Sequence, residues 1–134
     1  MQKANSADWK DWLRYAEDDK EHGEYLKGFA SEGAAKAITL TSHQLVEHSL
    51  KAFYIYKTKK LPPRTHDLSE LARLCASYGL QLSEDEKSTL ETLHGFYIPL
   101  RYPQPAETLP TKEEALQLLA EASALFEKIR SQLK

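Results

Sequence analysis

Three polar side chains are spaced so that they share one face of a predicted helix. Gln44, Glu47 and Lys51 occupy positions i, i+3 and i+7 of a long helical segment, and this spacing stacks side chains along one face. An exposed Glu47–Lys51 pair would contribute only about 0.3 kcal/mol. The surrounding helix is so apolar that we expect these polar side chains to be partly buried. Partly buried charged groups need hydrogen-bonding or ionic partners. We therefore expect these groups to face other polar side chains or a bound anion.

Two further segments carry groups suited to phosphate recognition. His66 follows a Pro-Pro turn and lies at the start of a predicted helix, where backbone N–H groups and the helix dipole favour anions. Arg101 and Tyr102 stand directly before Pro103. A guanidinium supplies paired donors to a phosphate, and a phenol ring offers a face on which a base can stack. These three residues are candidate partners for the Gln44–Glu47–Lys51 face.

The remaining reactive residues do not form a recognised catalytic or metal-binding pattern. His43 and His48 are five positions apart, so they lie on different helix faces and would not share a metal. The single cysteine, Cys75, excludes an internal disulfide and a cysteine-based zinc site. We expect a buried, unreactive thiol there. The sequence has no metal-ligand motif and no glycine-rich phosphate loop, so we expect neither a metal nor a cofactor.

Length and composition indicate one globular domain spanning residues 1–134. Of its 134 residues, 41% are hydrophobic and 28% are charged, and the formal net charge is −2. This balance lacks the basic excess typical of duplex binding, and we expect no sequence-specific DNA binding. No apolar run approaches the roughly 18 residues of a membrane span. The first residues lack the apolar stretch of a signal peptide, so we expect the protein in the cytoplasm.

The apolar periodicity predicts an all-α fold. The expected helices cover residues 7–27, 34–59, 68–78, 84–98 and 112–133. Three capping-box patterns mark helix starts: Asp67 with Glu70, Ser83 with Glu86, and Thr111 with Glu114. Residues 99–110 contain four of the six prolines, and this predicts an irregular loop of a length that is often functional or mobile.

Four short motifs, taken together, resemble the HEPN domain family, and the resemblance covers about residues 8–132. It is strongest to the small stand-alone bacterial and archaeal type. In order along the chain, the matching residues are Trp12, Asp18 and Asp19; Gln44, Glu47, Lys51 and Ala52; Thr65, His66, Asp67 and Leu68; and Arg101, Tyr102 and Pro103.

The resemblance implies an up-and-down bundle of four main helices plus a short extra helix. It also implies a homodimer and a link to nucleotides. Many similar proteins are partners of minimal nucleotidyltransferases and often act with them as toxin–antitoxin pairs. Other branches are metal-independent ribonucleases that use an Arg followed, four to six residues later, by a His.

This sequence departs from the ribonuclease pattern, because no histidine follows His94. We favour a non-catalytic dimer that binds a nucleotide, a nucleotidyltransferase partner or both, with RNA as a further candidate ligand. Its expected nucleotide-binding residues are Gln44, Glu47, Lys51, His66, Arg101 and Tyr102. The enzymatic alternative is a ribonuclease toxin that uses Arg101 and His66 in a composite dimer site. A third interpretation is a buried polar network that only fixes the bundle or the dimer.

Overall fold

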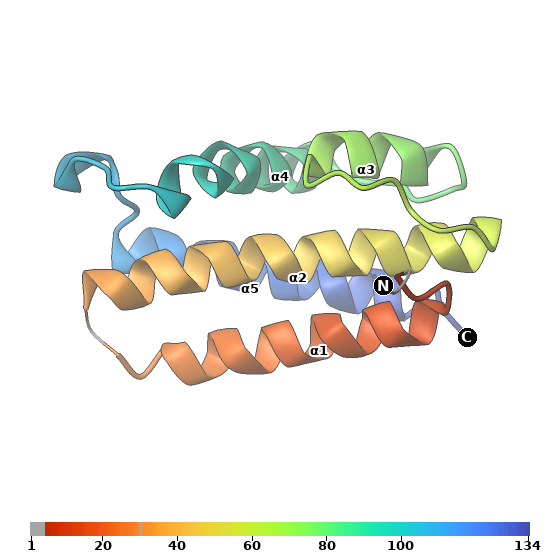
Figure 1. Ribbon diagram of the computed structural model, residues 1–134, viewed down its shortest axis with the longest axis horizontal. Coiled ribbons are helices and arrows are strands. Elements are labelled where there is room, and N and C mark those ends of the chain that lie inside the picture. The colour runs from red at the N-terminus through yellow and green to blue at the C-terminus, as the bar shows by residue number, and fades with distance from the viewer. Residues whose placement is uncertain (1–4, 30) are drawn as a thin grey trace, which may run out of the picture.

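The chain folds into a bundle of α-helices in the computed structural model, which describes residues 5–29 and 31–134. The α-helices are α1 (Trp9–Leu26), α2 (Glu32–Thr58), α3 (Leu68–Ala76), α4 (Glu84–Tyr97) and α5 (Lys112–Arg130). The described part of the chain contains no strand. The predicted all-α, up-and-down architecture is therefore confirmed, with α3 as the short extra helix (Figure 1).

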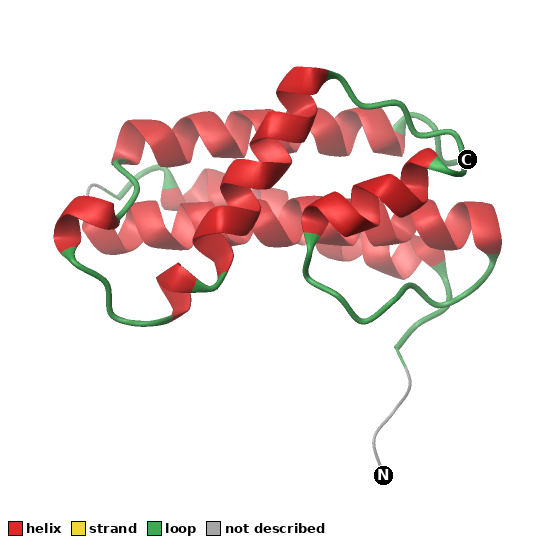
Figure 2. Cartoon of the chain, turned by 90° about the horizontal axis from the view of Figure 1, so that it is seen from above, coloured by secondary structure: helices red, strands yellow, loops and turns green. Residues whose placement is uncertain are grey.

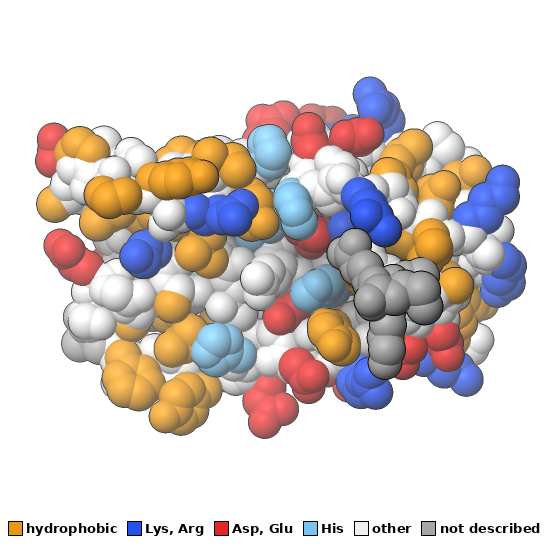
Figure 3. All heavy atoms as spheres, in the orientation of Figure 1, with side chains coloured by type: hydrophobic (Ala, Val, Ile, Leu, Met, Phe, Trp, Pro, Cys, Tyr) orange, Lys and Arg blue, Asp and Glu red, His pale blue; other side chains and the backbone are white. Residues whose placement is uncertain are grey.

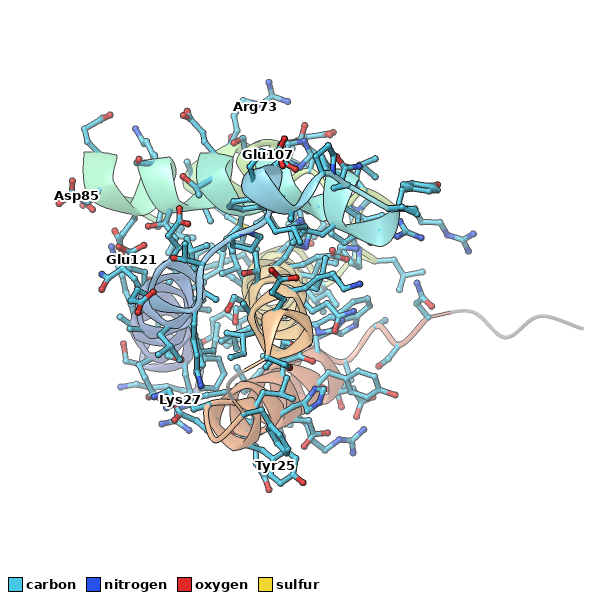
Figure 4. All side chains as sticks on the ribbon, turned by 90° about the vertical axis from the view of Figure 1, so that its left-hand side faces the viewer. Tyr25, Lys27, Arg73, Asp85, Glu107 and Glu121 are labelled. Carbon is cyan, nitrogen blue, oxygen red and sulfur yellow. The ribbon has the colours of Figure 1, made fainter. Side chains whose placement is uncertain are left out.

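Helix α2 is the centre of the bundle and packs against all four other α-helices. Viewed along the bundle, α1 lies on one side of α2 and α4 on the other, with α5 beside α2 (Figure 4). Helices α3 and α4 share a layer, and α4 crosses the long axis of the bundle obliquely (Figure 2). A helix that is apolar nearly all round needs such a central position, since a single buried stripe would leave the rest in water.

The core is built around the apolar side chains of α2. Ile38, Leu45 and Phe53 are fully buried there, and each such side chain contributes roughly 2 kcal/mol on leaving water. Phe126 of α5 is also buried in this cluster. Cys75 is buried as predicted, and burial raises the pKa of its thiol to about 12.

Most predicted helix starts are confirmed in detail. Complete capping boxes form at Ser83 with Glu86 and at Thr111 with Glu114. The prediction for α3 was partly wrong. Asp67 does cap this helix by accepting from backbone N–H groups, but the Glu70 carboxylate accepts from the Thr65 hydroxyl at 3.3 Å instead.

Replacing Ser83 with alanine should lower the free energy of unfolding by about 1 kcal/mol, because the Glu86 N–H loses its capping acceptor. Ser88→Ala is the matched control, since Ser88 is exposed inside the same helix and alanine is the better helix former. Urea unfolding followed by circular dichroism measures both. An equal loss in the two variants would show that the cap contributes nothing.

The proline-rich segment after α4 is more ordered than the predicted loop. It contains two short 3₁₀ turns, Pro99–Arg101 and Ala106–Thr108. The buried side chain of Leu100 anchors the first turn to the core. This anchor holds Arg101 at a defined place just beyond α4. None of the helices in residues 5–29 and 31–134 is long and apolar enough to cross a membrane.

Candidate functional site

The carboxylate of Glu47 is the centre of a polar cluster on α2. It is only 5% exposed. Lys51, one turn further along α2, donates from Nζ to Glu47 Oε2 at 2.9 Å. His66, from the segment between α2 and α3, places Nδ1 at 3.0 Å from Oε1 and 3.1 Å from Oε2. The Glu47–Lys51 pair therefore forms as helical spacing predicts, but it is a buried pair with a third partner.

The ionisation of Glu47 determines which nitrogen of the His66 ring carries a proton. Burial would raise the pKa of Glu47, but hydrogen bonds from His66 and Lys51 outweigh it, and the pKa lies below its ordinary value. An ionised carboxylate only accepts hydrogen bonds, so the His66 Nδ1 carries a proton and donates. The other ring nitrogen, Nε2, is then left for a ligand or a proton. Because the His66 side chain is 57% exposed, it connects the buried carboxylate to solvent.

The ring of Tyr97, at the end of α4, connects this cluster to Arg101. Its centroid lies 5.2 Å from that of His66. The Arg101 guanidinium carbon lies 5.3 Å from the Tyr97 centroid, which is within cation–π range. Sequence reasoning missed Tyr97. Its position four residues before Arg101 is the only signal that pointed to it.

His43 was also missed as part of this cluster. It is fully buried, stacks on Tyr97 with centroids 4.1 Å apart, and lies 3.7 Å from Glu47. Neither ring nitrogen has a hydrogen-bond partner within the described part of the chain. Loss of hydration lowers the pKa of His43 to about 4, despite the attraction of Glu47. His43 is therefore a neutral ring behind Tyr97, and its i, i+4 spacing from Glu47 was the available signal.

Two predicted site residues lie apart from this cluster. The side chain of Gln44 is exposed, contrary to our expectation that it would be partly buried with Glu47 and Lys51. Tyr102 is 63% exposed, and it makes no ring contact within residues 5–29 and 31–134. The structure thus brings together Glu47, Lys51 and His66, with Arg101 reached through Tyr97.

A pocket of about 240 Å³ opens beside the cluster. Its walls include Trp12, Lys51, Arg64 and His66. Lys51 Nζ lies 5.6 Å from the centroid of the Trp12 ring. Arg64 was not predicted as a site residue. Histidine side chains gather in the middle of this face of the molecule, with Lys and Arg side chains on both sides (Figure 3).

The charge balance of the site favours an anion. Lys51 compensates Glu47, whereas Arg64 and Arg101 form no ion pair within the described residues. The charge of Arg64 therefore remains uncompensated in the pocket that His66 lines, and that of Arg101 lies on the other contact of Tyr97. A larger cavity of about 530 Å³, between α3 and α4, shares no lining residue with this pocket. In residues 5–29 and 31–134, no group of three or more His, Cys, Asp or Glu side chains is placed to hold a metal ion.

The HEPN domain model matches residues 9–132, nearly the whole chain. The chain belongs to the HEPN family. Among solved structures, it is similar to TT1696 from Thermus thermophilus, with 22% identity and a TM-score of 0.74, covering 93% of this chain and 98% of that one. It is also similar to ST0689, an archaeal HEPN homologue, with 24% identity and a TM-score of 0.70, covering 95% and 98% of the two chains. No curated protein matches.

These two likenesses establish the HEPN fold, and the chemistry rests on this chain's own residues. The Arg-to-His spacing expected for ribonuclease branches is absent after Arg101. Within this HEPN fold, however, Tyr97 contacts both Arg101 and His66. A histidine that precedes the arginine in the chain therefore lies on the same surface, and only the packing of α4 against α2 and α3 reveals it.

Proposed function

We propose that this HEPN protein is a non-catalytic protein that binds the phosphate group of a nucleotide or of RNA in the pocket beside Lys51 and His66, which we call the phosphate pocket. The carrying observation is that Arg64 lines this pocket with Lys51 and His66 and forms no ion pair within residues 5–29 and 31–134. Arg101, also without an ion pair in that part of the chain, is connected to His66 through the Tyr97 ring. Lys51 gives one of its three donors to Glu47, so two remain for an anion. Glu47 accepts from Lys51 and His66 and so orients both side chains.

Loss of the two arginines tests this proposal best, because both are exposed and the fold should survive. A nucleotide at about 100 times its dissociation constant should add about 2.7 kcal/mol to wild-type stability, or several degrees of melting temperature. Arg64→Ala/Arg101→Ala should abolish the shift with ATP, GTP, their diphosphates and short single-stranded RNA. Arg73→Ala, an exposed arginine on α3, is the matched control. An unchanged shift in the double variant contradicts the proposal.

A metal-independent ribonuclease is the second candidate, and the Glu47–His66 contact is the observation that favours it. A carboxylate that holds Nδ1 leaves Nε2 free to take the 2′-hydroxyl proton as general base. The 2′-oxygen would then attack phosphorus to form a 2′,3′-cyclic phosphate and displace the 5′-oxygen, which would leave as a hydroxyl by taking a proton from water, and Arg101 would stabilise the added negative charge. RNA cleavage in the presence of a metal chelator that His66→Gln abolishes, while RNA binding persists, would favour this candidate over simple binding.

We also propose that the protein acts as a homodimer, alone or with a nucleotidyltransferase partner in a toxin–antitoxin pair. HEPN proteins are often dimeric. Several large apolar side chains are exposed in the described residues, and such surface is typical of interfaces. They include Phe29, Leu61, Tyr78 and Ile98. Light scattering on the purified chain gives its mass in solution, and a monomer at micromolar concentration contradicts the dimer.

A further inference from the structure

A second hollow lies next to the phosphate pocket and shares the lining residues Asn5 and Trp12 with it. Its volume is about 350 Å³, and its walls include Trp12, Arg14, Tyr15 and His48. Trp12 lines both hollows, so a ligand in one reaches the wall of the other. We call this second hollow the aromatic pocket. None of the functions considered above uses it.

His48 in the aromatic pocket is held by a carboxylate from the neighbouring helix. Its Nδ1 lies 2.6 Å from Asp19 Oδ2, and the two side chains are 20% and 15% exposed. Because a carboxylate accepts hydrogen bonds, this contact places the ring proton on Nδ1. In the neutral ring Nε2 is then an acceptor. Nε2 has no hydrogen-bond partner within the described ranges, and it is not among their buried unpaired atoms.

The walls around His48 suit a flat aromatic group. The ring centroids of Trp12 and Tyr15 lie 5.9 Å and 5.7 Å from that of His48. Tyr15 is 56% exposed, so a ligand can reach its side chain. The Arg14 guanidinium carbon lies 5.8 Å from the Tyr15 centroid. Open aromatic faces with a neighbouring arginine stack nucleobases without strong sequence preference, and the free acceptor of His48 suits a base N–H.

We infer that the aromatic pocket receives the base of the same nucleotide whose phosphate enters the phosphate pocket. Tyr15 stacks on the base, Trp12 forms the wall between base and phosphate, and His48 Nε2 accepts a hydrogen bond from a base N–H. Asp19 keeps His48 in the accepting tautomer. This inference rests on the proposed function, which it refines: the ligand is a complete nucleoside phosphate, either free or as a unit of RNA, and its base adds affinity to that of the phosphate group.

The test compares ligands with and without a base by calorimetry. The probes are 5′-AMP, ribose 5-phosphate and a short single-stranded RNA, each against wild type, Tyr15→Ala and His48→Gln. Tyr25→Ala is the matched control, because Tyr25 is an exposed tyrosine on the same helix (Figure 4) outside the aromatic pocket. We expect Tyr15→Ala to weaken AMP binding about tenfold, His48→Gln to weaken it less, and neither to change ribose 5-phosphate binding.

The outcomes separate this inference from the proposed function. If AMP and ribose 5-phosphate bind equally, and Tyr15→Ala changes neither, the base site is overturned while the phosphate site stands. If no phosphate-bearing probe binds to wild type, both proposals fail. Tyr15-dependent binding of AMP identifies a free nucleotide as ligand, and Tyr15-dependent binding of RNA alone identifies an RNA unit. Equal losses in Tyr25→Ala and Tyr15→Ala would contradict a specific base site.

Discussion

Replacing Glu47 with alanine should lower the free energy of unfolding by about 3–5 kcal/mol, the range for removing one partner of a buried ion pair. Lys51 is then left 6% exposed without its carboxylate, and His66 loses its acceptor. Urea unfolding of wild type and variant measures the loss. This is one of the two largest effects that we expect from a single change of residue or condition.

A double variant separates the unpaired charge from the lost packing. Glu47→Ala/Lys51→Met removes both charges and should recover much of the stability, because a buried pair is often replaceable by apolar side chains of similar volume. Glu84→Ala is the surface control, since Glu84 pairs with Lys87 at 3.5 Å and its own side chain is 91% exposed, and it should cost less than about 0.5 kcal/mol. If Glu47→Ala lowered the free energy of unfolding by as little as Glu84→Ala, the Lys51 ammonium would be hydrated in the variant.

Acid should destabilise the protein in a pH range that His43 sets. In the unfolded chain His43 takes up a proton below its ordinary pKa of 6.5, whereas in the fold it stays neutral down to about 4. Between these values the unfolded state binds more protons, so stability falls as pH falls. At about 1.4 kcal/mol per unit of pKa difference, the loss reaches about 3 kcal/mol at pH 4. Glu47 adds to this loss of stability only below pH 4.5, its ordinary pKa, since its pKa in the folded protein lies below that value.

The contribution of His43 can be isolated by comparing pH profiles. The charged groups around its ring are Glu47, His66 and His94. His43→Leu should abolish the part of the slope between pH 6.5 and about 4, whatever its effect on stability at neutral pH. His22→Leu, which changes an exposed histidine of α1, is the control and should keep the slope. Parallel profiles for wild type and His43→Leu would contradict this assignment.

These two expectations also address the structural interpretation of the cluster. A network that only fixes the bundle would show both stability effects and no response to any ligand. A binding site built on the same network would show both effects and also a nucleotide shift that depends on Arg64 and Arg101. Those arginines are exposed, so changing them tests binding with little effect on stability. The two roles are therefore separable by which residues each one needs.

Features that depend on neighbours along the chain could be predicted from the sequence. The five helices and their approximate ends follow from apolar periodicity, capping residues and prolines. The Glu47–Lys51 contact also follows, because helix geometry places positions i and i+4 side by side. His43 obeys the same spacing to Glu47, and its place in the cluster could have been inferred in this way. Local geometry of this kind does not depend on how the helices pack.

Which of these groups are buried, and which groups far apart in the chain come into contact, depends on the tertiary structure. His66 reaches Glu47 because the segment after α2 folds back along that helix, and Tyr97 reaches His66 because α4 packs on the same side. Gln44 shares the predicted face but stays exposed, since burial depends on which neighbour covers each turn. The His48–Asp19 contact likewise needs α1 against α2. Periodicity predicts that a face is buried against something, whereas the packing of several helices decides which side chain from another element lies opposite.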